Sequence, residues 1–322
     1  GKWRSSIKRN CNNFKIMKKI IVILILFYAN NILAQQDPLF SQYYSNDLMI
    51  NPAVSGSKSY NEFNIFTRQQ WLGFEGAPLT TSISYHGALN NRSALGGSLI
   101  YENLYPSMSG LLQLNYAYHI PLDYGNINLS FGIGAKLRYY SLDFNSKDLP
   151  PVQDNALSGD VYNKFLGDAA SGVYLYGRDF RIGFSSTNLL KTSFKDPVAG
   201  SPYDNKQVRN YFGLASYKFN IINKDWHLEP SILMRKTESF SSVYDLSSRI
   251  IYLNNSWTGI SYRTDQTVVV AFGFGSDSFQ VSYSYDHTLS GEIQKHSFGT
   301  HEIGISFYIK TLATQRHISF WD

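Results

Sequence analysis

Residues 127–139 read INLSFGIGAKLRY, and apolar side chains alternate with polar or small ones along the whole stretch. Successive side chains of a β-strand point to opposite faces, so this pattern predicts a strand with one apolar and one polar side. Shorter stretches repeat the alternation at 112–119, 281–286 and 302–309. No convincing amphipathic helix is found beyond residue 58. The body of the chain is therefore predicted to be all-β.

About fourteen such segments can be counted, and their number and spacing suggest a closed barrel. They lie at 59–70, 79–88, 94–104, 109–120, 126–144, 169–177, 180–188, 209–221, 225–236, 240–253, 256–263, 266–275, 278–286 and 297–309. The longest connections all follow odd-numbered segments, and they are 145–168, 189–208 and 287–296. Bacterial outer-membrane barrels have an even number of strands, with long extracellular loops on one side. The pattern predicts an antiparallel transmembrane outer-membrane β-barrel of about 14 strands.

The composition agrees with a membrane barrel and disfavours other classes. Of 322 residues, 43% are hydrophobic and 16% aromatic, but only 16% are charged. Soluble domains carry roughly 25% charged residues, which argues against a soluble helical enzyme, and the many aromatic residues argue against disorder. A secreted β-sandwich remains the alternative. It is less favoured because strands in globular proteins are usually about 5–6 residues long, and only a membrane barrel needs aromatic girdles at its strand ends.

The N-terminus has the features of an export signal. Lys18 and Lys19 precede the apolar run IIVILILF at 20–27, and Ala34 precedes a polar stretch. A basic start, a short apolar run and a small residue are typical of a secretory signal peptide, and a membrane span would need about 20 apolar residues. We expect residues 1–16 to be an over-extended N-terminus and residues 17–34, from Met17, to be a signal peptide.

Cleavage after Ala34 would change the charge of the protein. Residues 1–34 hold seven of the 29 basic residues, none of the 24 acidic ones and the single cysteine, Cys11. The exported chain would be slightly acidic and would have no disulfide and no lipid-anchor cysteine. A nucleic-acid partner is therefore not expected.

Residues 35–57 are expected to form an irregular segment ahead of the barrel. The pairs Asp37-Pro38 and Asn51-Pro52 favour turns, because the residue before a proline is driven away from the helical conformation. The segment would lie at or inside the periplasmic mouth as a partial plug, a docking strand or a flexible leader. The barrel is then predicted over 58–310 and a C-terminal tail over 311–322.

Six charged residues fall on the polar faces of predicted strands: Arg68, Lys136, Arg138, Arg263, Asp286 and Glu302. A charge on the lipid face costs about 2–4 kcal/mol near the midplane, so we expect all six to point into the lumen. They would form either a compensating network that holds the barrel closed or a surface for substrate or ions. Glycines on the same faces, Gly132 and Gly134 among them, indicate an interior that tapers or is filled.

Candidate catalytic and metal-binding residues are few. Ser84 and His86 share a predicted face and could suggest an outer-membrane phospholipase, but a nucleophile also needs a base within reach and an orienting third group. His287, His296 and His301 lack the close spacing of metal ligands. We therefore expect no catalytic site, no cofactor and no metal.

Several short motifs, taken in order, resemble one family. They are DPLFSQY at 37–43, INPAVSG at 50–56, RQQW at 68–71, GAPLT at 76–80, WTGISYR at 257–263, YSYD at 283–286 and GTHEI at 299–303. The string resembles the PorP/SprF proteins of the type IX secretion and gliding machinery of Bacteroidetes. The residues that carry it are Asp37, Pro38, Asn51, Pro52, Gly56, Trp71, Pro78, Trp257, Tyr285, Asp286, His301 and Glu302. The middle of the chain, about 145–210, matches no motif.

The resemblance implies a non-enzymatic protein of the outer membrane, embedded in its lipid. Its implied partners are type IX translocon subunits, secreted surface proteins such as gliding adhesins, and periplasmic peptidoglycan-linked or motor proteins. The implied role is to dock or anchor these partners. A passive channel for small or hydrophobic solutes is the alternative, because a barrel of this size can also enclose a narrow pore.

Overall fold

The computed structural model describes residues 40–123, 126–143, 161–194, 205–222, 225–238, 240–291 and 295–310. The segments predicted at 1–16, 17–34 and 311–322 lie outside the described residues, as do residues 35–39.

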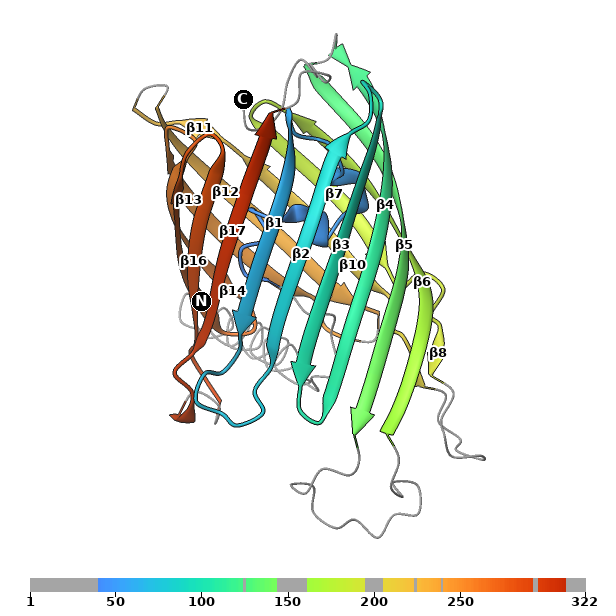
Figure 1. The fold of residues 1–322 in the computed structure, drawn as a ribbon. Helices are drawn as coiled ribbons and strands as arrows, with labels where there is room; N and C mark the ends of the chain where they lie inside the picture. Colours follow the sequence, from blue (N-terminus) through green and yellow to red (C-terminus); the bar gives the residue numbers. More distant parts are fainter. Residues whose placement is uncertain are drawn as a thin grey trace, which may run out of the picture. The chain divides into compact units, whose positions relative to one another are not determined.

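Fourteen strands of the described residues form one closed antiparallel sheet, as predicted (Figure 1). They are β1 (Tyr60–Gln69), β2 (Leu79–Ala88), β3 (Ser93–Leu104), β4 (Ser107–Leu122), β5 (Ile127–Asp143), β6 (Val161–Gly177), β7 (Phe180–Thr187), β10 (Asn210–Tyr217), β12 (Trp226–Thr237), β13 (Val243–Tyr252), β14 (Ser256–Arg263), β15 (Thr267–Gly275), β16 (Phe279–Thr288) and β17 (Thr300–Lys310). Each pairs with its neighbours in the chain, and β1 pairs with β17 to close the barrel. Closure leaves no open edge along the wall, which a hydrocarbon environment requires.

Three two-residue strands complete the described sheet structure. β8 (Ser193–Phe194) pairs with β9 (Asn205–Lys206) in a small separate ladder, and β11 (Phe219–Asn220) pairs with the start of β12. No helix in the described part of the chain is long and apolar enough to cross a membrane.

The predicted connection at 145–168 is wrong in its last third. Strand β6 begins at Val161, eight residues before the expected 169. The sequence VYNKFLGD at 161–168 does not alternate cleanly, but it pairs with β5 along its full length, from Ile127 opposite Gly177 to Asp143 opposite Val161. Ladder hydrogen bonds with a long partner strand therefore extend β6 beyond the part that the hydropathy pattern reveals.

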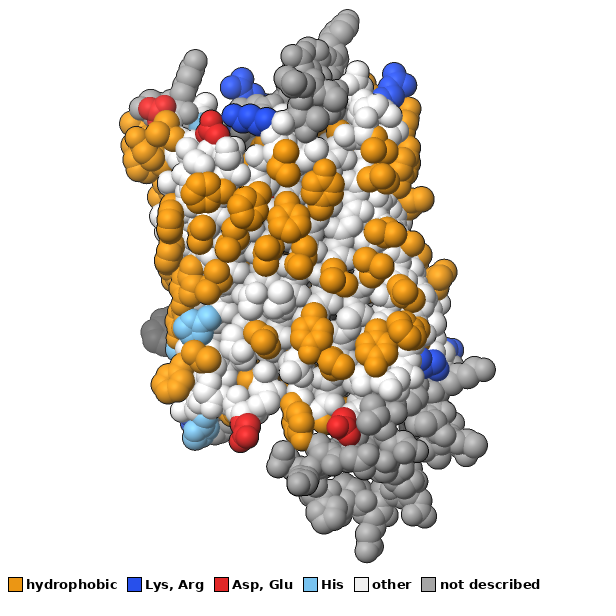
Figure 2. Space-filling view, viewed as in Figure 1, with side chains coloured by type: hydrophobic (Ala, Val, Ile, Leu, Met, Phe, Trp, Pro, Cys, Tyr) orange, Lys and Arg blue, Asp and Glu red, His pale blue; other side chains and the backbone are white. Residues whose placement is uncertain are grey.

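The outer wall is apolar between two polar rims. Outward side chains such as Ile133, Leu114 and Ile260 are 58–64% exposed. Figure 2 shows hydrophobic side chains over the height of the wall, with the visible Lys, Arg, Asp and Glu gathered near its two ends. This distribution is typical of a surface that faces lipid.

The two ends of the barrel differ in the length of their connections. At one end, which we call the loop end, the connections 144–160, 188–209 and 289–299 follow β5, β7 and β16. At the other end, the turn end, β6 and β7 are joined by Arg178 and Asp179 alone, and β13 and β14 by Leu253–Asn255. In outer-membrane barrels the long loops face the cell exterior and the short turns face the periplasm.

Residues 40–58 lie inside the barrel, and we call them the luminal segment. Every one of them except Met49 is buried. The segment contains two short 3-10 helices, η1 (Asp47–Met49) and η2 (Pro52–Val54), which Figure 1 shows enclosed by the strands. Its first residues contact strand ends near the loop end, and its last residues lie at the turn end, where β1 begins.

Candidate functional site

The luminal segment is shaped locally by Asn51 and Pro52. The Asn51 side chain accepts a hydrogen bond from the backbone N–H of Ala53 at 2.9 Å, which caps η2, and Pro52 occupies its first position. The Asn51 Nδ2 also donates to the carbonyl of Val173 on β6 at 3.1 Å. One side chain thus caps the start of η2 and attaches the segment to the wall.

Glycines of the wall make room for this turn. A Cβ at Gly132 on β5 would overlap the backbone of Pro52 and Ala53, and a Cβ at Gly172 on β6 would overlap the Asn51 side chain. Such inward-facing glycines indicate an interior that tapers or is filled. Their function here is to let the backbone of the luminal segment approach the sheet.

A buried charge cluster holds the segment near the loop end, and we call it the loop-end cluster. It consists of Ser41, Arg68, Asp245, Arg263, Asp286 and Glu302. Arg68 bridges Asp286 at 2.8 Å and Glu302 at 3.0 Å, and Arg263 Nε donates to Asp245 at 3.2 Å. All of these charged side chains are at most 7% exposed.

The luminal segment joins this cluster through neutral groups. The Ser41 hydroxyl donates to Asp286 at 2.6 Å and accepts from Arg68 at 2.8 Å and Arg263 at 2.9 Å. The backbone N–H groups of Ser41 and Gln42 donate to the two oxygens of Glu302. The segment therefore completes the hydrogen bonding of charges that belong to the wall.

Four of the six predicted luminal charges meet in the loop-end cluster, and two do not. Lys136 is also buried, but its Nζ donates to Asn188 at 2.7 Å, and Asp168 lies opposite it on β6. Arg138 is half-buried, two residues further along β5, where its register partners are Leu111 and Leu166.

A second buried cluster lies near the turn end, and the sequence reasoning missed it. We call it the turn-end cluster: Asp47, Arg181, Glu229 and Arg249. Arg181 bridges Asp47 of the segment and Glu229 of β12, both at 2.9 Å, and Glu229 also bonds Arg249 at 2.5 Å. All four side chains are at most 2% exposed. The three wall residues lie at inward positions of predicted strands, so the alternation could have found them.

Aromatic and apolar contacts surround the turn-end cluster. The Arg249 guanidinium lies 4.2 Å from the centre of the Tyr44 ring, which meets Trp257 edge to face at 5.2 Å. Trp257 donates its indole N–H to Gln280 at 3.0 Å. Inward apolar side chains of neighbouring strands join Tyr43, Tyr44 and Ile50 in one buried cluster: Phe212, Leu214, Leu233, Ile251, Trp257 and Ala271. Such a core is unusual in a barrel, whose interior is normally polar.

The Ser84 and His86 pair does not have the geometry of a nucleophile and its base. His86 Nδ1 accepts from the backbone N–H of Gly56 at 3.1 Å, and Nε2 lies 3.0 Å from Glu62. Ser84 instead donates to Asn46 of the luminal segment at 3.1 Å. One ring nitrogen of the histidine thus holds the end of the segment, and the other is engaged with Glu62 of β1.

Most of the remaining family-like residues are described by the structure, and each has contacts or a backbone conformation that supports the fold. Gly56 and Trp71 adopt positive φ values of 63° and 46°. The Tyr285 and His301 rings lie 5.3 Å apart, and the backbone N–H of Trp71 donates to Thr300 at 3.2 Å. Asp37 and Pro38 lie outside the described residues. Pro78 accepts from the backbone N–H of Gln70 at 2.9 Å.

The predicted histidines are not gathered with other metal ligands. His301 Nδ1 lies 2.7 Å from the Tyr283 hydroxyl, and the His287 ring stacks on Tyr285. Among the residues that the structure describes, no three His, Cys, Asp or Glu side chains are placed to hold a metal ion.

Outside the membrane-spanning strands, one exposed ion pair lies at the loop end. Lys191 bonds Glu238, which follows β12, and the two side chains are 34% and 37% exposed. The hydrogen bond from Lys191 lowers the pKa of the Glu238 carboxyl.

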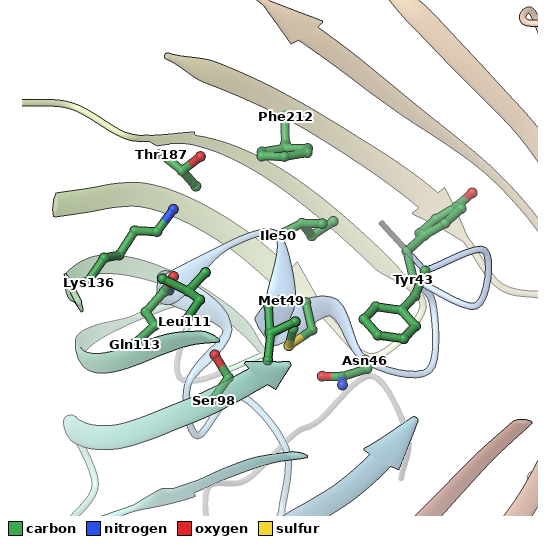
Figure 3. A pocket seen from close by; sticks show the side chains of 12 residues that line it. Tyr43, Asn46, Met49, Ile50, Ser98, Leu111, Gln113, Lys136, Thr187 and Phe212 are labelled. Atoms are coloured by element: carbon green, nitrogen blue, oxygen red, sulfur yellow. The ribbon is translucent and has the colours of Figure 1, made fainter. Parts of the chain in front are cut away.

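Beside the luminal segment, on its loop-end side, a narrow pocket remains (Figure 3). Its lining includes Tyr43, Met49 and Ile50 of the segment and Lys136 and Phe212 of the wall. The recess measures about 560 Å³ with its open side, but its enclosed part is only about 30 Å³. A cavity needs roughly 10–15 Å³ of such enclosed volume to hold one water, so this one has room for about two waters.

No curated protein matches the sequence. Among solved structures, outer membrane protein Omp33 of Acinetobacter baumannii is 9% identical, with a TM-score of 0.45 over 79% of this chain and 100% of Omp33. The P. putida toluene transporter TodX is 11% identical, with a TM-score of 0.47 over 83% of this chain and 94% of TodX. At these values neither structure bears on function.

The family comparison covers most of the sequence. The model of the type IX secretion system membrane protein PorP/SprF matches residues 32–307, which includes the luminal segment and nearly all of the barrel. The motif resemblance is thereby confirmed. The fold and the family together place the protein in the outer membrane. The chain belongs to the PorP/SprF family of type IX secretion system membrane proteins.

Proposed function

We propose that this PorP/SprF barrel is a closed docking scaffold of the type IX secretion machinery. In this role the loop end holds an exported surface protein, such as an adhesin. Translocon subunits, or periplasmic peptidoglycan-linked or motor proteins, bind elsewhere on the barrel. The protein acts by binding and catalyses no reaction.

The observation that carries this proposal is the filled lumen. Residues 40–58 are held by two buried charge clusters and an apolar core, and the pocket beside them encloses about 30 Å³. A barrel built to pass solutes leaves an aqueous channel through its interior. A filled barrel with long connections at one end is better suited to binding partners on its outside than to transport.

A binding role is also favoured over catalysis. The serine and histidine that could have formed a hydrolytic pair are both bonded to the luminal segment or to Glu62. A nucleophile would need its base within hydrogen-bonding distance and free to accept a proton.

Two measurements test the proposal. The protein is affinity-purified from its native outer membrane, and the proteins that accompany it are identified by mass spectrometry. We expect a translocon subunit or an exported surface protein. A barrel lacking residues 146–157 is the test variant, and one lacking 292–294, a shorter deletion in another loop-end connection, is the control. Loss of the exported protein only from the first variant supports docking at the loop end.

The second measurement is conductance in planar bilayers. We expect the intact protein to be closed. Steady open channels, together with purification free of any partner, would contradict the docking scaffold and favour the passive channel. A variant without residues 37–57 checks that the assay detects an opened lumen.

A further inference from the structure

The sheet has a step at the loop end, where β6 extends beyond its neighbour. Strand β5 pairs with β6 along all of Val161–Gly177, but β7 pairs only with Ser171–Tyr176. The backbone of Leu189 then bonds Ala169, and Thr192 bonds the carbonyl of Gly167. Among the described residues, no strand pairs with residues 161–166 on that side. Figure 1 shows β5 and β6 reaching beyond β8 at this end.

The free groups of this edge can be assigned from the ladder. In a strand the N–H and C=O of one residue point to the same side, and those of the next residue point to the other. The carbonyls of Ala169 and Gly167 are bonded on the side away from β5. The backbone groups of Phe165, Asn163 and Val161 therefore point the same way. They present three donors and three acceptors over about 13 Å, at roughly 3.3 Å per residue.

The surroundings of the edge suit a polypeptide partner rather than lipid. Phe165 is 67% exposed, and its ring lies 5.0 Å from that of Tyr139, whose hydroxyl donates to Asn163 at 2.9 Å. Lipid chains cannot satisfy backbone groups, whereas an added strand bonds to all of them. Unpaired edges without proline or a bulge are ready to accept such a strand.

Charge and orientation indicate which strand fits. Lys164 is the only charged residue in 161–167, so an acidic residue opposite it would be favourable. A second copy of this chain fits less well. Two copies in one membrane point the same way, so their β6 edges could pair only in parallel, and each would bring a lysine.

We propose that residues 161–166 of β6 are a docking edge that accepts an acidic, extended segment of an exported protein as an added β-strand. This inference rests on the proposed function, because it names the place where the loop end would hold its partner.

The test uses a photo-reactive benzophenone amino acid in place of Asn163, in cells that carry the complete secretion machinery. The same amino acid in place of Tyr244, on the outer face of β13, is the positional control. We expect ultraviolet light to join position 163, but not 244, to an extended acidic segment of an exported protein. The segment is read from the cross-linked peptides by mass spectrometry.

The decisive comparison is between two second-site variants. Phe165→Pro removes an edge donor while leaving the ladder to β5 intact, and it should lower the cross-linking yield by about tenfold or more. Phe165→Ala keeps the N–H, and the yield should stay within about twofold. Heat-modifiable migration on gels shows that both variants fold.

The outcomes separate this inference from the proposed function. An unchanged yield with Phe165→Pro, or a cross-link to a second copy of the chain, overturns the docking edge. If the exported protein still copurifies while position 163 gives no cross-link, docking occurs elsewhere and only the edge is refuted. If no partner copurifies at all, the proposed function fails as well.

Discussion

The loop-end cluster and the turn-end cluster hold the same segment by different means. At the loop end, Arg68 and Arg263 already face three carboxylates of the wall, and the segment adds only the Ser41 hydroxyl and two backbone N–H groups. At the turn end, Arg181 and Arg249 share the single wall carboxylate of Glu229, and the segment supplies the second, Asp47.

This difference indicates how the segment is fastened. Removing one partner of a buried ion pair is costly because the other charge stays buried without compensation. The loop-end cluster keeps its counter-charges when the segment leaves, whereas the turn-end cluster does not. The segment should therefore be released first at the loop end and last at the turn end.

The largest effect is expected from the turn end. Asp47→Asn removes the charge that faces Arg181 and should destabilise the seated segment by about 3–5 kcal/mol. The measurement is protease cleavage within residues 40–58 of the barrel in detergent, together with the temperature at which the barrel unfolds on a gel. The control is Ser45→Ala, which alters a buried uncharged residue close to Asp47 in the sequence and should change the cleavage and the unfolding temperature little. Equal cleavage in both variants would show that Asp47 does not fasten the segment.

A smaller effect is expected from the wall beside η2. Gly132→Val would place side-chain atoms where the backbone of Ala53 lies, and overpacking typically costs about 1–3 kcal/mol. Increased protease cleavage of the segment should accompany it. Gly110→Val is a suitable control, because a Cβ there meets no atom within 4 Å. If both variants behave alike, the wall beside η2 tolerates bulk and Gly132 is not needed for the luminal segment to pack there.

The loop end should respond less than the turn end. Ser41→Ala removes a neutral hydroxyl that is hydrogen-bonded to three charged groups. A hydrogen bond to a charged group contributes about 1.5–3 kcal/mol to stability. Because Asp286 and Glu302 remain paired with Arg68, we expect the lower end of this range. The same cleavage assay measures it. A loss as large as that of Asp47→Asn would reverse the proposed order of release.

The smallest effect is expected from the exposed pair at the loop-end rim. Lys191 lowers the pKa of Glu238. This pair therefore stabilises the protein at pH values above the ordinary carboxyl pKa of about 4.3, and the stabilisation is lost as the pH falls through the lowered pKa. Both side chains are about one-third exposed, so water and salt screen the pair. Lys191→Ala should leave the unfolding temperature at pH 7 unchanged. A clear decrease at pH 7 that vanishes near pH 3 would show a stronger pair than its exposure suggests.

Much of the architecture could be predicted from the order of residues. Alternation along 127–139 and its repeats predicted a fourteen-stranded barrel, because a strand places successive side chains on opposite faces. The same alternation placed Arg68, Arg263, Asp286 and Glu302 on inward faces, and the structure brings these four together. The motif string identified the family, and the family comparison confirms it.

The tertiary structure alone decided what fills the barrel and which charges meet. Asp47 lies outside any alternating strand, so nothing in its neighbourhood predicts that it pairs with Arg181, 134 positions away. The early start of β6 was hidden for a similar reason, since ladder bonds to β5 extend a strand whose hydropathy does not alternate cleanly. Local periodicity records which face a side chain occupies. Contacts between distant segments depend on closure of the sheet around residues 40–58, and that is a property of the folded chain.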